Sequence, residues 1–346
     1  MKVSSRISAA IAAIVLAAVV STRAQDAPAS HPATPTEPIA AIIDAFSTHD
    51  IVALGEGPHN NEQGHAFRLR LIRDPKFAQT VNDIVVEFGN ARYQDLMDKF
   101  VAGGSIPRVV FRQVWQNTTI PGTVWDVPIY EEFFGAVRMV NASLPKEKQM
   151  RVLLGDPPID WDGVKTEADA DKWLAQRDAH AAEAIKREVL ARKRRALVIY
   201  GDGHLQGRSE RPPHSLVARL EADGARVFTI SNSFADLSSL QPDVSSWAVP
   251  SLALVRDTPI GLKGYEFFYG ALPPGDYWKT QRMQDQFDAV LYLGPPSAMT
   301  MAKLSPALCA DAAYIKMRTD RLALRKGTEG QVKRLEEYCA ASKPKP

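Results

Sequence analysis

IVALGEGPHNNE, residues 51–62, contains the pattern on which the fold assignment rests. Its first four residues are apolar without alternation, which is typical of a strand buried on both faces of a parallel sheet. Similar short runs recur and are expected to be strands, at 84–88, 151–154, 196–200, 226–230 and 289–293. Because segments with helical periodicity separate these runs, the sequence predicts an α/β fold with a layered, mostly parallel central sheet flanked by helices.

The same periodicity analysis places the helices. Residues 242–275 are dense in proline, glycine and aromatic residues and are predicted to be a long irregular excursion. No internal repeat and no linker is visible after residue 38, so residues 39–346 are predicted to form one domain. The expected helices are 38–47, 63–73, 93–102, 130–141, 168–194 (the longest) and 215–222, with extra C-terminal helices at about 311–325 and 329–340.

The first 24 residues have the three parts of a secretory signal. Lys2 and Arg6 give a positive start, residues 7–20 are apolar, and Ala24 ends a small-residue cleavage site. An uncleaved membrane anchor is the alternative, but the apolar run is shorter than the ~20 residues that span a bilayer. We therefore expect a periplasmic or secreted protein with no stable membrane span after cleavage, beginning with a flexible leader at 25–38.

Positive and negative charges are nearly balanced along the chain. The sequence has 42 Lys and Arg against 40 Asp and Glu, a net charge of +2. Removal of the predicted signal takes away three basic residues and leaves 39 against 40, a net charge of −1. Because nucleic-acid binding needs a concentrated basic face, nucleic acid is not an expected partner. A small-molecule substrate is the partner that we expect.

The two cysteines, Cys309 and Cys339, both lie in the C-terminal part of the chain. In an oxidising compartment they form either a disulfide or two free thiols, and the sequence leaves both possibilities open. A disulfide would join the last helices to each other. We assign neither cysteine a role in chemistry.

Carboxylates and histidines follow four of the predicted strands at their carboxyl ends. In an open α/β sheet, ligands bind at this edge. A charged group directly after a buried strand needs a partner or water, so we predict that these groups face one shared cavity. They are Glu56, His59 and Glu62 after 51–54, Glu87 in 84–88, Asp156 after 151–154, and Asp202 and His204 after 196–200.

Glu56 and His59 are three residues apart around a glycine-bearing turn, so both side chains can reach one spot. A carboxylate beside an imidazole fixes its tautomer and raises its basicity, which suits a general base near neutral pH. We predict His59, Glu56, Glu87 and His204 as catalytic residues. The same four could instead bind a divalent metal through mixed nitrogen and oxygen ligands. Water activation with or without a metal leads to hydrolysis, and the sequence does not separate the two.

A dense group of aromatic residues occupies 111–134. Ordinary core packing is the favoured interpretation, and an apolar wall for a bulky substrate is the alternative. Under the second interpretation Trp115 would contact the substrate. Together with it, we predict Glu62, Asp156 and Asp202 as substrate contacts. No phosphate-binding glycine motif and no Gly-x-Ser-x-Gly elbow occurs, which argues against nucleotide binding and against a serine hydrolase.

The motif Gly55-Glu56-x-x-His59-x-x-Glu62 resembles the Gly-Glu-x-x-His-Gly-x-x-Glu motif of the erythromycin esterase family. Asn60 and Gly201 depart from that family's pattern. The resemblance covers roughly residues 51–230. It continues in Glu87, in Glu131…Arg138-x-x-Asn141 and in Arg177-Asp178…Ala182-Glu183, whereas Gly201-Asp202-Gly203-His204 is closer to the Gly-x-Gly-His of the ChaN and Tiki proteins.

This resemblance implies an exported hydrolase in which His59 activates water for attack on an ester or amide bond. The similarity to ChaN implies a different alternative, a haem- or iron-binding uptake protein without turnover, with haem as its cofactor. A pseudoenzyme with altered motifs is a third possibility. Hydrolysis and haem binding are distinguished by whether the purified protein has a Soret absorption band.

Overall fold

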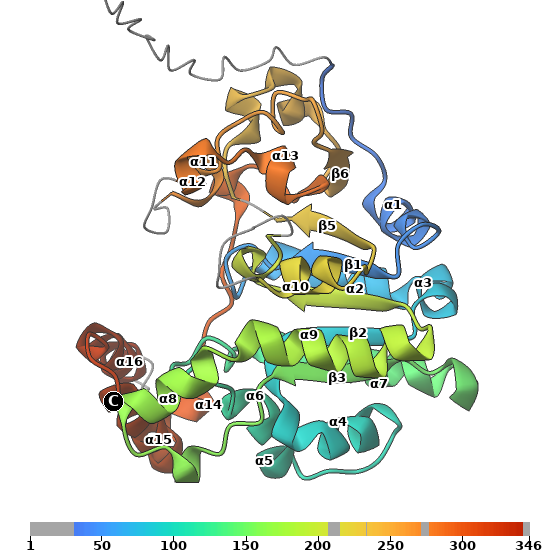
Figure 1. Cartoon of the computed structure of the whole chain (residues 1–346). Coiled ribbons are helices and arrows are strands. Elements are labelled where there is room, and N and C mark those ends of the chain that lie inside the picture. Colours follow the sequence, from blue (N-terminus) through green and yellow to red (C-terminus); the bar gives the residue numbers. More distant parts are fainter. Residues whose placement is uncertain (1–30, 207–214, 233, 271–276, 342–346) are drawn as a thin grey trace, which may run out of the picture.

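The computed structural model describes residues 31–206, 215–232, 234–270 and 277–341, and within them seven strands form one central sheet (Figure 1). Their order is β3-β2-β4-β1-β5-β7-β6, and only the β6–β7 pair is antiparallel among the pairings found. This confirms the predicted α/β fold. The strands are β1 (Ile51–Gly55), β2 (Asp83–Asn90), β3 (Arg151–Asp156), β4 (Ala196–Tyr200), β5 (Val227–Ser231), β6 (Ser251–Leu254) and β7 (Ala289–Tyr292).

Helices cover both faces of the sheet, which is why the strands are apolar throughout. Ile51 and Ala53 of β1 belong to one core cluster, whereas Val52 and Leu54 belong to the other. The first cluster includes residues of α9 and α10, and the second includes residues of α2 and α7, on opposite sides of the sheet (Figure 1). The main helices are α1 (Pro38–Ala45), α2 (Glu62–Arg73), α3 (Pro75–Thr80), α4 (Gln94–Val101), α7 (Pro128–Ala142), α8 (Glu167–Leu174), α9 (Arg177–Glu188), α10 (Leu216–Ala222), α15 (Ala312–Ala323) and α16 (Glu329–Ala341).

Several one-turn helices complete the fold. They are α5 (Arg108–Phe111), α6 (Gln113–Gln116), α11 (Glu266–Tyr269), α12 (Tyr277–Thr280), α13 (Met283–Gln286) and α14 (Pro306–Cys309). The last three helices, α14, α15 and α16, form a C-terminal unit with a small apolar cluster of its own. A disulfide between Cys309 and Cys339 joins α14 to α16, which settles the question that the sequence left open.

The predicted helix 168–194 is wrong in its extent. It is two helices, α8 and α9, with a break at residues 175–176. The periodicity continues across the break, and no proline or glycine marks it. The two helices nevertheless pack in different places, because Ala170 of α8 belongs to a small cluster with Ile159, whereas Ile185 of α9 packs on the sheet. The break also puts Arg177 at the start of α9.

Two further expectations need correction. The predicted irregular excursion 242–275 contains β6, a four-residue strand at the edge of the sheet that pairs with β7 and with Thr36; it was missed because it lies in a stretch dense in proline, glycine and aromatic residues. The predicted leader 25–38 is packed in its described part, because Ala33 is 2% exposed and its amide donates to Gln241. The predicted signal, residues 1–24, lies outside the described residues. Among the helices that are described, none combines the length and apolarity of a membrane span.

Candidate functional site

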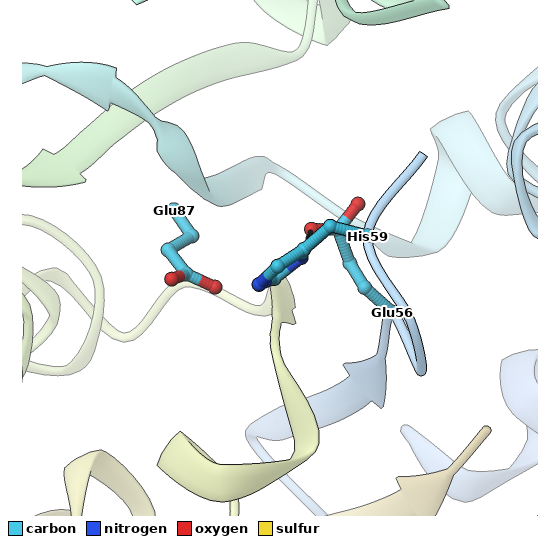
Figure 2. A group of neighbouring side chains, drawn as sticks. All are labelled: Glu56, His59 and Glu87. Carbon is cyan, nitrogen blue, oxygen red and sulfur yellow. Dashed lines mark hydrogen bonds and ion pairs between the residues drawn. The ribbon is translucent and has the colours of Figure 1, made fainter. Parts of the chain in front are cut away.

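The predicted site residues come together at the carboxyl edge of four adjacent strands, β3, β2, β4 and β1. Glu56 and His59 follow β1 directly, Glu87 lies in β2, and His204 closes a short turn after β4. Figure 2 shows the His59 ring between the carboxylates of Glu56 and Glu87. The alternation of buried strands with helices produces this convergence, because all four strands run in the same direction.

A buried carboxylate orients the His59 ring. Glu56 is 1% exposed, and its Oε2 lies 2.9 Å from His59 Nδ1. Its other oxygen accepts a hydrogen bond at 2.8 Å from Nη1 of Arg68, near the middle of α2. Gly57 makes the turn between Glu56 and His59 possible, because its φ is +64° and a Cβ there would lie 2.1 Å from the carbonyl oxygen of Asn232.

The Nδ1 contact leaves His59 Nε2 available for chemistry. Among the described residues no hydrogen-bond partner of Nε2 is found, and this atom points toward Glu87 (Figure 2). Burial opposes protonation of the ring, but the hydrogen bond to Glu56 and the nearby carboxylate charges outweigh it and raise the pKa of His59. The edge of Trp125 packs against the ring at a centroid distance of 4.5 Å. His59 is therefore held in one orientation with a basic nitrogen exposed.

Glu87 is the buried anion at the centre of the site. It is 1% exposed, accepts a hydrogen bond from the Gly201 amide at 2.7 Å and forms an ion pair with Arg177. Burial favours its neutral form, but the charges of His204 and Arg177 dominate and hold the pKa of Glu87 well below its usual range. A charged carboxylate in this position stabilises cations around it.

His204 lies between two carboxylates. Its Nδ1 lies 2.5 Å from Asp178 Oδ1, and its Nε2 lies 3.4 Å from Glu87 Oε1. Burial opposes its charge, but Glu87 and Asp178 overcome this and raise the pKa of His204 to about 10. His204 is therefore a cation at neutral pH and unsuited to act as a base.

Sequence reasoning gave no role to three charged residues that hold this site together: Arg68, Arg177 and Asp178. Arg177 and Asp178 appeared only as part of the family resemblance, and the expected unbroken helix hid their position at the start of α9. Arg68 lies on α2, 12 residues after the glutamate that it binds. Only the packing of α2 and α9 on the sheet brings these charges to the carboxylates.

The predicted substrate contacts are placed differently from expectation. Glu62 is exposed and bonded to Thr300, Trp115 is 3% exposed within the core, and Asp156 is bonded to both the amide and the hydroxyl of Thr119. None of these three borders the cavity described below, which leaves Asp202 as the one that does. Glu62 turns away because it begins α2, and Trp115 faces inward with the other aromatic residues of 111–134.

Both buried aspartates support the loops of the site. Burial favours the neutral form of Asp156 against the charge of Arg177 and raises its pKa to about 7. Burial likewise raises the pKa of Asp202. Asp202 accepts hydrogen bonds from Ser231 Oγ at 2.7 Å and from the Gly57 amide at 3.2 Å, so it ties the turn after β1 to the end of β5.

A cavity of about 380 Å³ opens beside the two histidines. Its lining includes His59 and His204 together with the aromatic residues Phe234, Phe268 and Tyr269. This volume lies within the range of small-molecule sites, which combine a mostly apolar lining with a few polar groups. The arrangement can therefore bind an organic molecule with an apolar part and place a polar bond near His59.

Whether a divalent metal fits this site depends on the ligand atoms that the four predicted residues can offer. Ligand atoms of Glu56, His59 and Glu87 lie within 4.8 Å of one another, a spacing that could hold an ion. Each carboxylate, however, already pairs with an arginine, and His204, the fourth predicted ligand, is protonated. Metal binding needs deprotonated ligands with free lone pairs. As arranged here, the four residues do not fit a divalent metal.

Comparison with known proteins relates the fold to solved structures. No family model and no curated protein matches the chain. A succinoglycan biosynthesis protein has a similar structure with a TM-score of 0.56 and 11% identity, over 79% of this chain and 96% of that one. A Bacillus cereus protein matches with a TM-score of 0.51 and 13% identity, over 79% and 97%.

A third similar structure is ChaN of Campylobacter jejuni, described with cofacial haem binding. Its TM-score is 0.39 and its identity 12%, over 73% of this chain and 90% of that one. At such identities the two likenesses with TM-scores above 0.5 establish a shared fold only. The more specific resemblance to erythromycin esterases and Tiki proteins stays a hypothesis.

Proposed function

We propose that this protein hydrolyses an ester or amide bond of a small molecule with an apolar part, using water activated by His59. The observation that carries the proposal is the 2.9 Å contact between Glu56 Oε2 and His59 Nδ1, with Nε2 left unpartnered beside a cavity. A carboxylate that orients an imidazole in this way is a standard arrangement for a general base.

In the proposed reaction His59 Nε2 removes a proton from a water molecule as its oxygen bonds to the carbonyl carbon. The carbonyl π electrons move to the carbonyl oxygen and produce a tetrahedral oxyanion. Collapse of this species restores the carbonyl and breaks the bond to the leaving alcohol or amine, which takes the proton from His59. Glu56 stabilises the imidazolium that exists between the two transfers.

His204 has a different role in the proposal. It borders the same cavity and carries a positive charge, so it stabilises the negative charge that develops on the carbonyl oxygen. In this proposal the two histidines thus divide the work. Neutral His59 accepts a proton, and cationic His204 supplies electrostatic stabilisation.

The test is a screen of small esters and amides with purified protein and the variant His59→Gln. On any substrate that is turned over, this variant should lose about 10²–10⁴-fold in kcat/KM. The matched control is His180→Gln, a histidine on α9 that is absent from the cavity lining and should leave activity unchanged. Full activity of a folded His59→Gln variant would refute the proposal.

The pH dependence adds a second readout to this screen. Because only neutral His59 can accept a proton, kcat/KM should rise with pH through the raised pKa of this residue. Glu56→Gln removes the charge that favours the imidazolium, so the midpoint should move to lower pH while turnover falls. An unchanged midpoint would assign the titration to another group.

Haem or iron binding without turnover is the alternative that the sequence raised. His59 Nε2 is the unpartnered ring nitrogen at the cavity and could offer one ligand to haem iron. The absorption spectrum of purified protein after addition of haemin decides this. A Soret shift that disappears in His59→Gln, together with no hydrolysis in the screen, would favour binding over catalysis.

A further inference from the structure

A second cavity borders the loop that carries the candidate site. Pro58 and His59 line the first cavity, and their neighbour Asn60 lines the second. The second cavity has a volume of about 410 Å³ and lies between segment 120–127 and the C-terminal unit. Its walls include the apolar side chains of Ile120, Val124, Val127, Leu304 and Leu335.

The charges around this cavity have one sign. Lys303 and Arg334 belong to its lining, which contains no acidic residue. Over the part of the chain that the structure describes, no carboxylate forms an ion pair with either cation. By contrast Lys333, one residue earlier on α16, pairs with Glu337 at 3.7 Å. A cleft lined by charges of one sign concentrates the field and attracts the opposite charge.

Asn60 gives the cavity a further polar group. Both backbone polar groups of Asn60 already have hydrogen-bond partners. Its amide donates to Tyr130 Oη at 3.1 Å, and its carbonyl oxygen accepts from the Ala302 amide at 2.8 Å. Its side-chain oxygen is buried and has no hydrogen-bond partner. Because that oxygen can only accept, a bound carboxylate would instead be contacted by the side-chain nitrogen Nδ2, for which no hydrogen bond is found among the described residues.

We propose that this cavity is a binding site for an amphipathic carboxylate, a molecule with an apolar chain and one anionic end. The apolar walls accommodate the chain, as in other small-molecule sites. The two unpaired cations pair with the carboxylate, which Arg334 can bind through two nitrogen atoms. Asn60 Nδ2 can donate a further hydrogen bond to the carboxylate, and this residue lies beside His59 in the chain but outside its cavity.

Isothermal titration calorimetry with decanoate tests the proposal on the full chain. Decanoate should bind, whereas decanol lacks the charge and acetate lacks the chain, so both should bind more weakly. The double variant Lys303→Gln/Arg334→Gln should weaken decanoate binding by about 5–25-fold, the product of two partly exposed ion pairs. Lys333→Gln is the matched control, since this exposed lysine already has a partner.

Two single variants show in which of the two cavities decanoate binds. Val124→Trp should abolish binding while the thermal transition stays in place, because Val124 is only partly buried. His59→Gln should bind decanoate like the wild type, so failure of the hydrolase proposal leaves this one intact. Equal binding of decanol, or unchanged affinity in the double variant or in Val124→Trp, would overturn the proposed site.

Discussion

The charge of His204 gives the sharpest prediction, because two carboxylates, Glu87 and Asp178, raise its pKa against burial and one of them can be neutralised alone. Asp178→Asn keeps the shape of the partner and removes its charge from the 2.5 Å contact with His204 Nδ1. Glu87 still faces the ring from the other side, at 3.4 Å, so the histidine keeps one anionic neighbour. Loss of one nearby charge typically lowers a histidine pKa by about 1–2 units. The pKa of His204 should therefore fall from about 10 to about 8–9.

The same change has a stability consequence whose sign follows from the pKa. The folded-state pKa of His204 lies above its ordinary value, so its charge stabilises the native state fully at low pH. This contribution is lost as pH rises from about 6.5 toward 10. At pH 6 Asp178→Asn should reduce the free energy of unfolding by about 1.4–2.7 kcal/mol, since each pKa unit corresponds to about 1.4 kcal/mol. The difference from the wild type should shrink above pH 9.

Proton NMR titration of the histidine rings measures the pKa directly, with His204→Gln to assign the resonance. Urea unfolding between pH 6 and 9.5 measures the stability change. Glu183→Gln is the matched control, because Glu183 lies on the same helix and pairs with Lys186 at the surface. The reasoning would be refuted if His204 titrated near pH 6.5 in the wild type, or if Asp178→Asn left its pKa unchanged.

Three other predictions concern the framework of the site. Arg318 and Asp126 form a buried ion pair. Arg318→Met should lower the free energy of unfolding by about 3–5 kcal/mol, because it leaves the Asp126 carboxylate buried without its partner. In urea unfolding, the double variant Asp126→Leu/Arg318→Met should recover most of this loss. Purely additive effects would contradict the pairing. Gly57→Ala should lower activity and thermal stability because a Cβ meets a backbone oxygen at 2.1 Å, whereas Gly163→Ala, with open space around it, should be neutral. Dialysis against EDTA should leave hydrolysis unchanged, since arginines already neutralise Glu56 and Glu87; loss of activity restored by added zinc would show that this interpretation of the carboxylates is wrong.

Local patterns in the sequence were sufficient for the fold class and for part of the site. Strands buried on both faces are apolar throughout, and this signal placed β1 to β5 and β7 to within about two residues. Glu56 and His59 were predictable as a pair because three residues around a glycine turn separate them. The apolar run of β6 was hidden in a stretch rich in proline and glycine, and the break between α8 and α9 had no local signal.

Tertiary structure alone decided the charge states and the role of each polar residue. Arg68 and Arg177 reach Glu56 and Glu87 only because helices pack across the sheet, and these pairings argue against a metal. His59 and His204 both follow strand ends in the sequence, but only the folded structure places two carboxylates beside each ring, and these raise both pKa values against the effect of burial. Electrostatic interactions depend on distance in space and on burial, neither of which sequence spacing reports.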